Sequence, residues 1–175
     1  VLYLLSCNLA EVLVIFFAIL LDWPLPLVAI QLLWLNLVTD GLPAVALGVD
    51  PAAKDIMKRM PRAVGEKILN KKALTQMMLT STFITIAVLY LFWNAKDISL
   101  VKAQTLAFTS LVIFEMIRVY TVRADYKIGV LSNKLLMLAV AISILLQLVV
   151  IYTPLNVFFK SVALSIADWG MILGL

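Results

Sequence analysis

Three side chains that carry oxygen share one face of an apolar segment with the sequence QLLWLNLVTDGLP. Asn36, Thr39 and Asp40 are spaced three and four residues apart within it, so a helix points them in the same direction. An aspartate in the middle of hydrocarbon costs about 2.5 to 3.5 kcal/mol on insertion scales, and such a residue usually belongs to a functional site. Gly41 and Pro43 follow directly, and proline frees a backbone carbonyl because it has no N–H to donate. This combination predicts a cation site inside the membrane.

Two further carboxylates, Glu11 and Glu115, lie deep within other apolar stretches. Asn8 precedes Glu11 by three residues and shares its helical face. If the first two helices pack antiparallel, their polar faces meet near the middle of the bilayer. Ca²⁺ takes six to eight oxygen ligands in flexible geometry, whereas Mg²⁺ demands a tighter octahedron and keeps its waters. The predicted metal ligands are Asn8, Glu11, Asn36, Thr39, Asp40 and Glu115.

Each of these side chains also has a purely structural interpretation. The amides and the hydroxyl could hydrogen-bond between helices, each for about 0.6 to 2 kcal/mol. Glu11 and Asp40 could pair with a cation, but neither of their apolar stretches contains Lys or Arg. Glu115 has Arg118 one helical turn away, which could neutralise it. We interpret Arg118 itself as a residue whose long side chain extends to the cytoplasmic surface.

The composition places the chain in the membrane class. Hydrophobic residues make up 64% and charged residues 14% of 175 positions, and the mean hydropathy is +1.08. Such a chain is too apolar for a water-soluble domain of this length. Most of its basic residues lie in short connectors, so the net charge of +4 indicates topology, and we expect no nucleic-acid partner. One Cys and no His argue against a zinc or copper site.

We predict an all-α fold, a polytopic transmembrane bundle of about six helices in a single domain. About 20 apolar residues are needed to cross the hydrocarbon layer as a helix. The second helix is expected to break near Asp40, Gly41 and Pro43. The predicted spans are residues 1–21, 27–49, 73–93, 100–120, 135–152 and a sixth, truncated span over 162–175.

The basic connectors alternate in a way that predicts the orientation. Residues 50–72 carry seven cations against three anions, and residues 121–134 form a second basic connector on the same side. Both are predicted to be cytoplasmic, which puts the start of the chain on the cytoplasmic side of a multi-pass membrane protein. The chain begins in apolar sequence without a leader, so we expect Val1 to be an internal position.

Three sequence runs resemble the carboxy-terminal membrane half of P-type ATPases, from the fifth to the tenth membrane helix. They are NLAEV (8–12), QLLWLNLVTDGLPAVALGVDP (31–51) and DIMKRMPR (55–62). Within that family they are most similar to the sarco/endoplasmic-reticulum-type calcium pumps and their prokaryotic relatives. SLVIFEM (110–116) is similar to the eighth helix and YTPLNVFF (152–159) to the loop between the ninth and tenth.

The resemblance implies a set of ion ligands. It implies that one calcium lies among Asn8, Glu11, Thr39, Asp40 and Glu115. Asn36 and Asp40 would contribute to a second calcium, whose remaining ligands lie on the fourth membrane helix, outside this chain. Arg118, beside Glu115, departs from the family pattern, so the sequence is compatible with either one or two transported ions per cycle.

The resemblance also implies an ATP-driven calcium pump as the full-length protein. The chain has no P-loop and no aspartyl-phosphorylation motif, so ATP and Mg²⁺ would act in cytoplasmic domains outside it. Those domains, the remaining membrane helices and the lipid bilayer are the implied partners. Three clustered carboxylates cannot all stay ionised after the cation leaves, so the prediction is calcium export from the cytosol with proton counter-transport.

Several other transport classes compete with this prediction. A secondary cation/proton exchanger is expected to show an inverted repeat with broken helices in both halves, and only one half has a Gly/Pro break beside a carboxylate. A channel needs a repeated pore-lining pattern, which the sequence lacks. A P-type pump for another cation is a further alternative, and a purely structural bundle leaves Asp40 and Glu11 unexplained.

Overall fold

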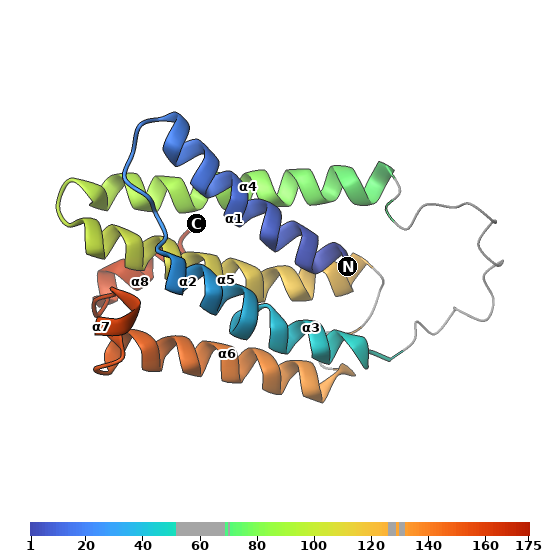
Figure 1. The fold of residues 1–175 in the computed structure, drawn as a ribbon. Helices are drawn as coiled ribbons and strands as arrows, with labels where there is room; N and C mark the ends of the chain where they lie inside the picture. The colour runs from blue at the N-terminus through green and yellow to red at the C-terminus, as the bar shows by residue number, and fades with distance from the viewer. Residues whose placement is uncertain (52–68, 70, 126–128, 130–131) are drawn as a thin grey trace.

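The computed structural model describes residues 1–51, 69, 71–125, 129 and 132–175, and regular structure within them is entirely helical. Five helical stretches are long and apolar enough to cross a membrane. They run in alternating directions side by side (Figure 1). The all-α transmembrane bundle is therefore confirmed. In chain order the stretches are α1 (Leu2–Leu20), the combined α2 (Ala29–Trp34), η1 (Leu35–Thr39) and α3 (Gly41–Gly48), α4 (Lys71–Lys96), α5 (Leu100–Asp125) and α6 (Lys134–Tyr152).

The α5 helix lies at the centre of the bundle. In its most apolar 18-residue segment, 72% of the residues are buried, compared with 33 to 44% in the other four stretches. Small residues help to explain this position, because Ala103 and Ala107 of α5 and Ala95 of α4 all belong to the main apolar core and allow close helix approach. A central α5 also places Glu115 in the interior, where its side chain is completely buried.

The second membrane stretch changes helix type just before Asp40. Leu35–Thr39 form a π-helical turn, and the Asp40 N–H donates to the Leu35 carbonyl five residues back at 2.8 Å. The sequence predicts a break near Asp40, Gly41 and Pro43, and in the structure Gly41 and Pro43 lie in the first turn of α3, where a missing N–H costs little. The widened turn thus precedes Asp40, and single π-turns inside α-helices are frequent at functional sites.

The chain after α6 forms only short helices. They are α7 (Asn156–Phe159) and α8 (Ile166–Leu173), and α8 has eight residues within the range predicted as a sixth span. Asp168 fixes α8, because it accepts a hydrogen bond from Ser165 at 2.7 Å and pairs with Lys102 of α5 at 2.8 Å. At the other end of the bundle, α5 continues through Asp125 into the connector predicted at 121–134. Most of the predicted loop 50–72 lies outside the described residues.

A polar cluster joins α3, α5 and α6 at the end of the bundle that also holds the N-terminus (Figure 1). The Arg123 Nε donates to Asp50 at 2.9 Å, and Arg123 is 2% exposed. The Asn133 amide donates to both Asp50 and the Ala46 carbonyl at 2.9 Å, while its oxygen accepts from the Leu136 N–H and caps α6. Asn133 therefore joins the end of α3 to the start of α6, and Asp50 connects both to Arg123 of α5.

We expect Asn133→Ala to lower the free energy of unfolding by about 1 to 2 kcal/mol, since it removes a helix cap and two interhelical hydrogen bonds. The measurement is thermal unfolding of the full-length protein in detergent. Asn94→Ala is the matched control, because the exposed Asn94 amide donates only within its own helix in the structure described, to the Tyr90 carbonyl. Equal melting temperatures for the two variants would contradict the linking role.

Candidate cation-binding site

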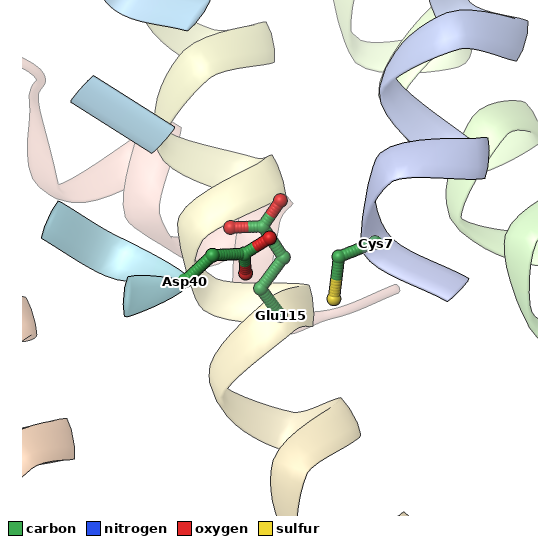
Figure 2. A group of neighbouring side chains, drawn as sticks. All are labelled: Cys7, Asp40 and Glu115. Atoms are coloured by element: carbon green, nitrogen blue, oxygen red, sulfur yellow. The ribbon is translucent and has the colours of Figure 1, made fainter. Parts of the chain in front are cut away.

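Side chains from three membrane stretches converge where the π-turn ends. Asp40 follows η1, Glu115 lies on α5 and Cys7 lies on α1, and each is at most 1% exposed. Figure 2 shows the carboxylates of Asp40 and Glu115 beside each other, with the Cys7 side chain extending from α1 on the facing side. One ligand atom from each residue lies within 4.8 Å of the others. Groups around a single divalent ion have this spacing, because their bonds to the ion are each about 2.0 to 2.6 Å long.

The Glu11 carboxylate of α1 belongs to the same cluster. Its side chain is 4% exposed and interacts electrostatically with both Asp40 and Glu115. Asn36 lies at the outer edge of the cluster, exposed, and its amide donates to Glu11 Oε2 at 2.8 Å. The predicted meeting of the first two helices through their acidic residues is therefore present in the structure.

Each of the three carboxylates is held through one oxygen by a neutral donor. The Tyr3 hydroxyl donates to Asp40 Oδ1 at 2.8 Å, and the Asn36 amide fills the same role for Glu11. The Thr39 hydroxyl donates to the Leu35 carbonyl at 2.9 Å and also lies 3.4 Å from Glu115 Oε2. These contacts orient the carboxylates without neutralising them.

The second oxygen of each carboxylate is buried without a partner. Glu11 Oε1, Asp40 Oδ2 and Glu115 Oε1 accept no hydrogen bond from any residue that the structure describes. Burying an acceptor without a partner is costly, and such groups in a folded protein require an explanation. A bound cation would supply such a partner, because carboxylate oxygens are the preferred ligands of hard divalent ions.

Asn8 is placed less directly than its neighbours. Its side chain is half-buried, and its amide donates to the Leu4 carbonyl of the same helix at 2.9 Å. That bond uses the nitrogen and leaves the amide oxygen as a possible ligand. Of the predicted ligands, the structure joins Glu11 to Asn36 and Thr39 to Glu115 by direct contacts, and it brings Asp40 into the same cluster.

Sequence reasoning missed two residues of the cluster, Tyr3 and Cys7. Both lie on α1 at spacings of four residues, and together with Glu11 they form one stripe along the helix. That stripe is the signal that was available in the sequence. A single cysteine is enough to bring sulfur to the cluster, because Cys7 lies beside the carboxylates of Asp40 and Glu115.

The interpretation of Arg118 as a residue that extends to the surface is wrong. Its side chain is 3% exposed, and its guanidinium donates to the Ser6 hydroxyl of α1 and to Thr121, both at 3.3 Å. Ser6 precedes Cys7, so Arg118 places a positive charge beside the cluster on the side of α1. A buried cation near three carboxylates offsets part of their mutual repulsion.

Known proteins are similar to this chain over nearly its whole length. The sequence model of one family, described as cation transporting ATPase, C-terminus, matches residues 24–175. The chain is 42% identical over 180 residues to a calcium-transporting ATPase of Bacillus subtilis, a match covering 99% of the chain and 20% of that protein. It is 36% identical to human calcium-transporting ATPase type 2C member 1, covering 98% of the chain and 19% of that protein. The corresponding values for calcium-transporting ATPase 1 of Bacillus cereus are 36%, 99% and 22%. The chain thus spans about a fifth of the length of these relatives.

Proposed function

Because the chain belongs to the family of cation-transporting ATPase C-terminal domains, we propose that it is the ion-binding membrane domain of an ATP-driven calcium pump. The observation that carries this proposal is the buried cluster of Glu11, Asp40 and Glu115, each with one oxygen that lacks a partner among the described residues. The relatives are named calcium-transporting ATPases, which supports calcium as the transported ion.

The donors around the cluster suit calcium. Its three carboxylates come from three membrane stretches, and hydroxyl and amide oxygens lie beside them. Calcium accepts a mixed set of this kind at about 2.3 to 2.6 Å. In the proposal the ligands are Asn8, Glu11, Asn36, Thr39, Asp40 and Glu115. ATP and Mg²⁺ act in cytoplasmic domains outside this chain, and those domains and the remaining membrane helices complete the pump.

Proton counter-transport follows from the burial of the cluster. When the calcium leaves, three carboxylates remain in a region of low dielectric, where like charges repel strongly. Protonation of one or more of them removes that repulsion, so protons replace the cation and return to the cytosolic side in the next half of the cycle. The N-terminal end of the chain faces the cytosol in this scheme.

The test uses the full-length protein in sealed vesicles whose cytoplasmic face is outward. We expect ATP to drive uptake of radioactive calcium while a trapped dye reports a rise in internal pH. Uptake driven by a pH gradient without ATP would overturn the pump in favour of a cation/proton exchanger. ATP-dependent phosphorylation stimulated by Mn²⁺ or another cation, and not by calcium, would overturn calcium as the substrate.

Tyr3→Phe should weaken calcium binding roughly 2- to 10-fold, because one hydrogen bond that orients Asp40 is worth about 0.5 to 1.5 kcal/mol. The bond removed is the 2.8 Å contact from the phenol to Asp40 Oδ1. The measurement is the calcium concentration that half-saturates phosphorylation of the full-length protein from ATP. Tyr90→Phe, at an exposed position on α4, is the control and should leave this concentration unchanged. An unchanged value for Tyr3→Phe would show that Asp40 is oriented by other contacts.

A further inference from the structure

Cys7 points into the cation cluster and away from lipid. Its side chain is completely buried and extends from α1 on the side where Asp40 and Glu115 lie (Figure 2). The sulfur and one oxygen of each carboxylate lie within 4.8 Å of one another.

A second observation indicates that this point is a ligand site. Asp40 Oδ2 and Glu115 Oε1 are buried and accept no hydrogen bond from the residues that the structure describes. Both side chains are at most 1% exposed. The cluster therefore offers a sulfur and two carboxylates that are close enough for a common ion, and each carboxylate has one oxygen without a hydrogen bond among the described residues.

We propose that Cys7 is a metal ligand of this cluster, and that it enables the site to bind a thiophilic divalent cation such as Cd²⁺ as well as calcium. Thiolate sulfur selects soft metals, whereas a site of oxygens alone favours hard ones. On binding, the S–H bond breaks, the electron pair on sulfur forms the bond to the metal, and the proton passes to water. The calcium part of this statement rests on the proposed function, and the sulfur part rests on the geometry of Cys7.

The competing role for Cys7 is that of a small apolar residue in the helix interface, which is how free cysteine usually behaves. The two roles predict different metal preferences. A packing residue changes the affinities for Cd²⁺ and Ca²⁺ together or leaves both unchanged. A sulfur ligand changes the affinity for Cd²⁺ selectively.

The experiment compares three forms of the full-length protein: the wild type, Cys7→Ser, and Cys7→Ser combined with Thr105→Cys. Thr105 is fully buried on α5, ten residues or about 15 Å of helix from Glu115, so the double variant keeps a membrane-embedded thiol away from the cluster. Affinities for Cd²⁺ and Ca²⁺ are measured by competition with radioactive calcium. We expect the ratio of the Cd²⁺ to the Ca²⁺ affinity to fall by at least about 10-fold in Cys7→Ser and to stay low in the double variant. An unchanged ratio in Cys7→Ser, or its recovery in the double variant, would overturn the proposal.

X-ray absorption at the cadmium edge supplies a readout that does not depend on pumping. The wild-type protein with bound Cd²⁺ should show a sulfur neighbour that Cys7→Ser lacks. Only oxygen neighbours in the wild type, with normal calcium-dependent phosphorylation, would refute the role of Cys7 and leave the pump proposal standing. A sulfur neighbour that depends on Cys7, without any calcium-dependent phosphorylation, would support the sulfur ligand and refute the calcium pump.

Discussion

Asp40→Asn is expected to abolish calcium-dependent phosphorylation of the full-length protein at calcium concentrations that saturate the wild type. Asp40 is 1% exposed, and its Oδ1 is already occupied by the Tyr3 hydroxyl. Because that hydroxyl donates, the asparagine oxygen must stay at this position, and the NH₂ group then replaces Oδ2. The substitution therefore removes a negative charge and directs two N–H donors at the cation.

The expected loss of calcium affinity for Asp40→Asn is on the order of 100-fold or more, since breaking a buried charge interaction costs about 3 to 5 kcal/mol. It is measured as phosphorylation from ATP over a range of calcium concentrations. Asp22→Asn is the matched control, because Asp22 is exposed and has a φ of 55°, a conformation that asparagine also adopts readily. Wild-type calcium dependence in Asp40→Asn would remove Asp40 from the site.

The sequence predicted most of the helical bundle because apolar length is a strong signal in a membrane protein. The observed α1 at Leu2–Leu20 and α6 at Lys134–Tyr152 lie within one residue of the predicted ends. The end of α5 was predicted less well. Residues after 120 were assigned to a basic connector, but Arg123 is buried against Asp50, so the helix continues to Asp125. A tertiary partner, which the local sequence does not reveal, removes the cost of that charge.

The π-turn was beyond sequence reasoning for a similar reason. Proline and glycine indicated a break near Asp40, and an interruption is present. The position of the interruption depends on which N–H groups donate to the carbonyls of Leu35–Thr39. The Asp40 N–H donates to the Leu35 carbonyl, and this hydrogen bond belongs to the π-turn. Hydrogen-bond pairing of this kind is determined by the packed structure and is not encoded in the residue types alone.

The carboxylates of the site were predictable, whereas the rotation of α1 was not. Intramembrane acids are few and costly, so Glu11 was identified from composition alone. Which residues of α1 lie beside Glu11 in the site depends on the rotation of the helix about its axis. Around that axis, a residue four positions away is offset from Glu11 by about 40° and a residue three positions away by about 60° in the opposite direction. Asn8 and Cys7 flank Glu11 in this way, and the structure turns Cys7 toward Asp40. The periodicity of the sequence does not show whether Asn8 or Cys7 faces the site, because this depends on how α1 packs against the neighbouring helix.

Glu11→Gln and Glu115→Gln are each expected to weaken calcium binding by roughly 100-fold, and their combination is expected to lose much less than the product of the two. Each change removes one carboxylate charge and keeps an oxygen that can accept the contact from Asn36 or Thr39. The two side chains interact directly, and residues that share one partner are not additive. If both bind the same ion, the first substitution already removes most of the affinity to which the second contributes.

This comparison shows whether Glu11 and Glu115 bind the same calcium ion. A double-mutant cycle on calcium-dependent phosphorylation of the full-length protein gives the coupling free energy between Glu11 and Glu115. Asp97→Asn, at an exposed turn between α4 and α5, combined with either variant supplies the additive reference. If the loss of calcium affinity in the double variant equals the product of the two single losses, a shared ion is contradicted, because independent effects require that Glu11 and Glu115 bind different ions. Strong coupling, in contrast, is the result expected if these two buried carboxylates, which interact with each other and each have one oxygen without a hydrogen bond among the described residues, bind the same ion.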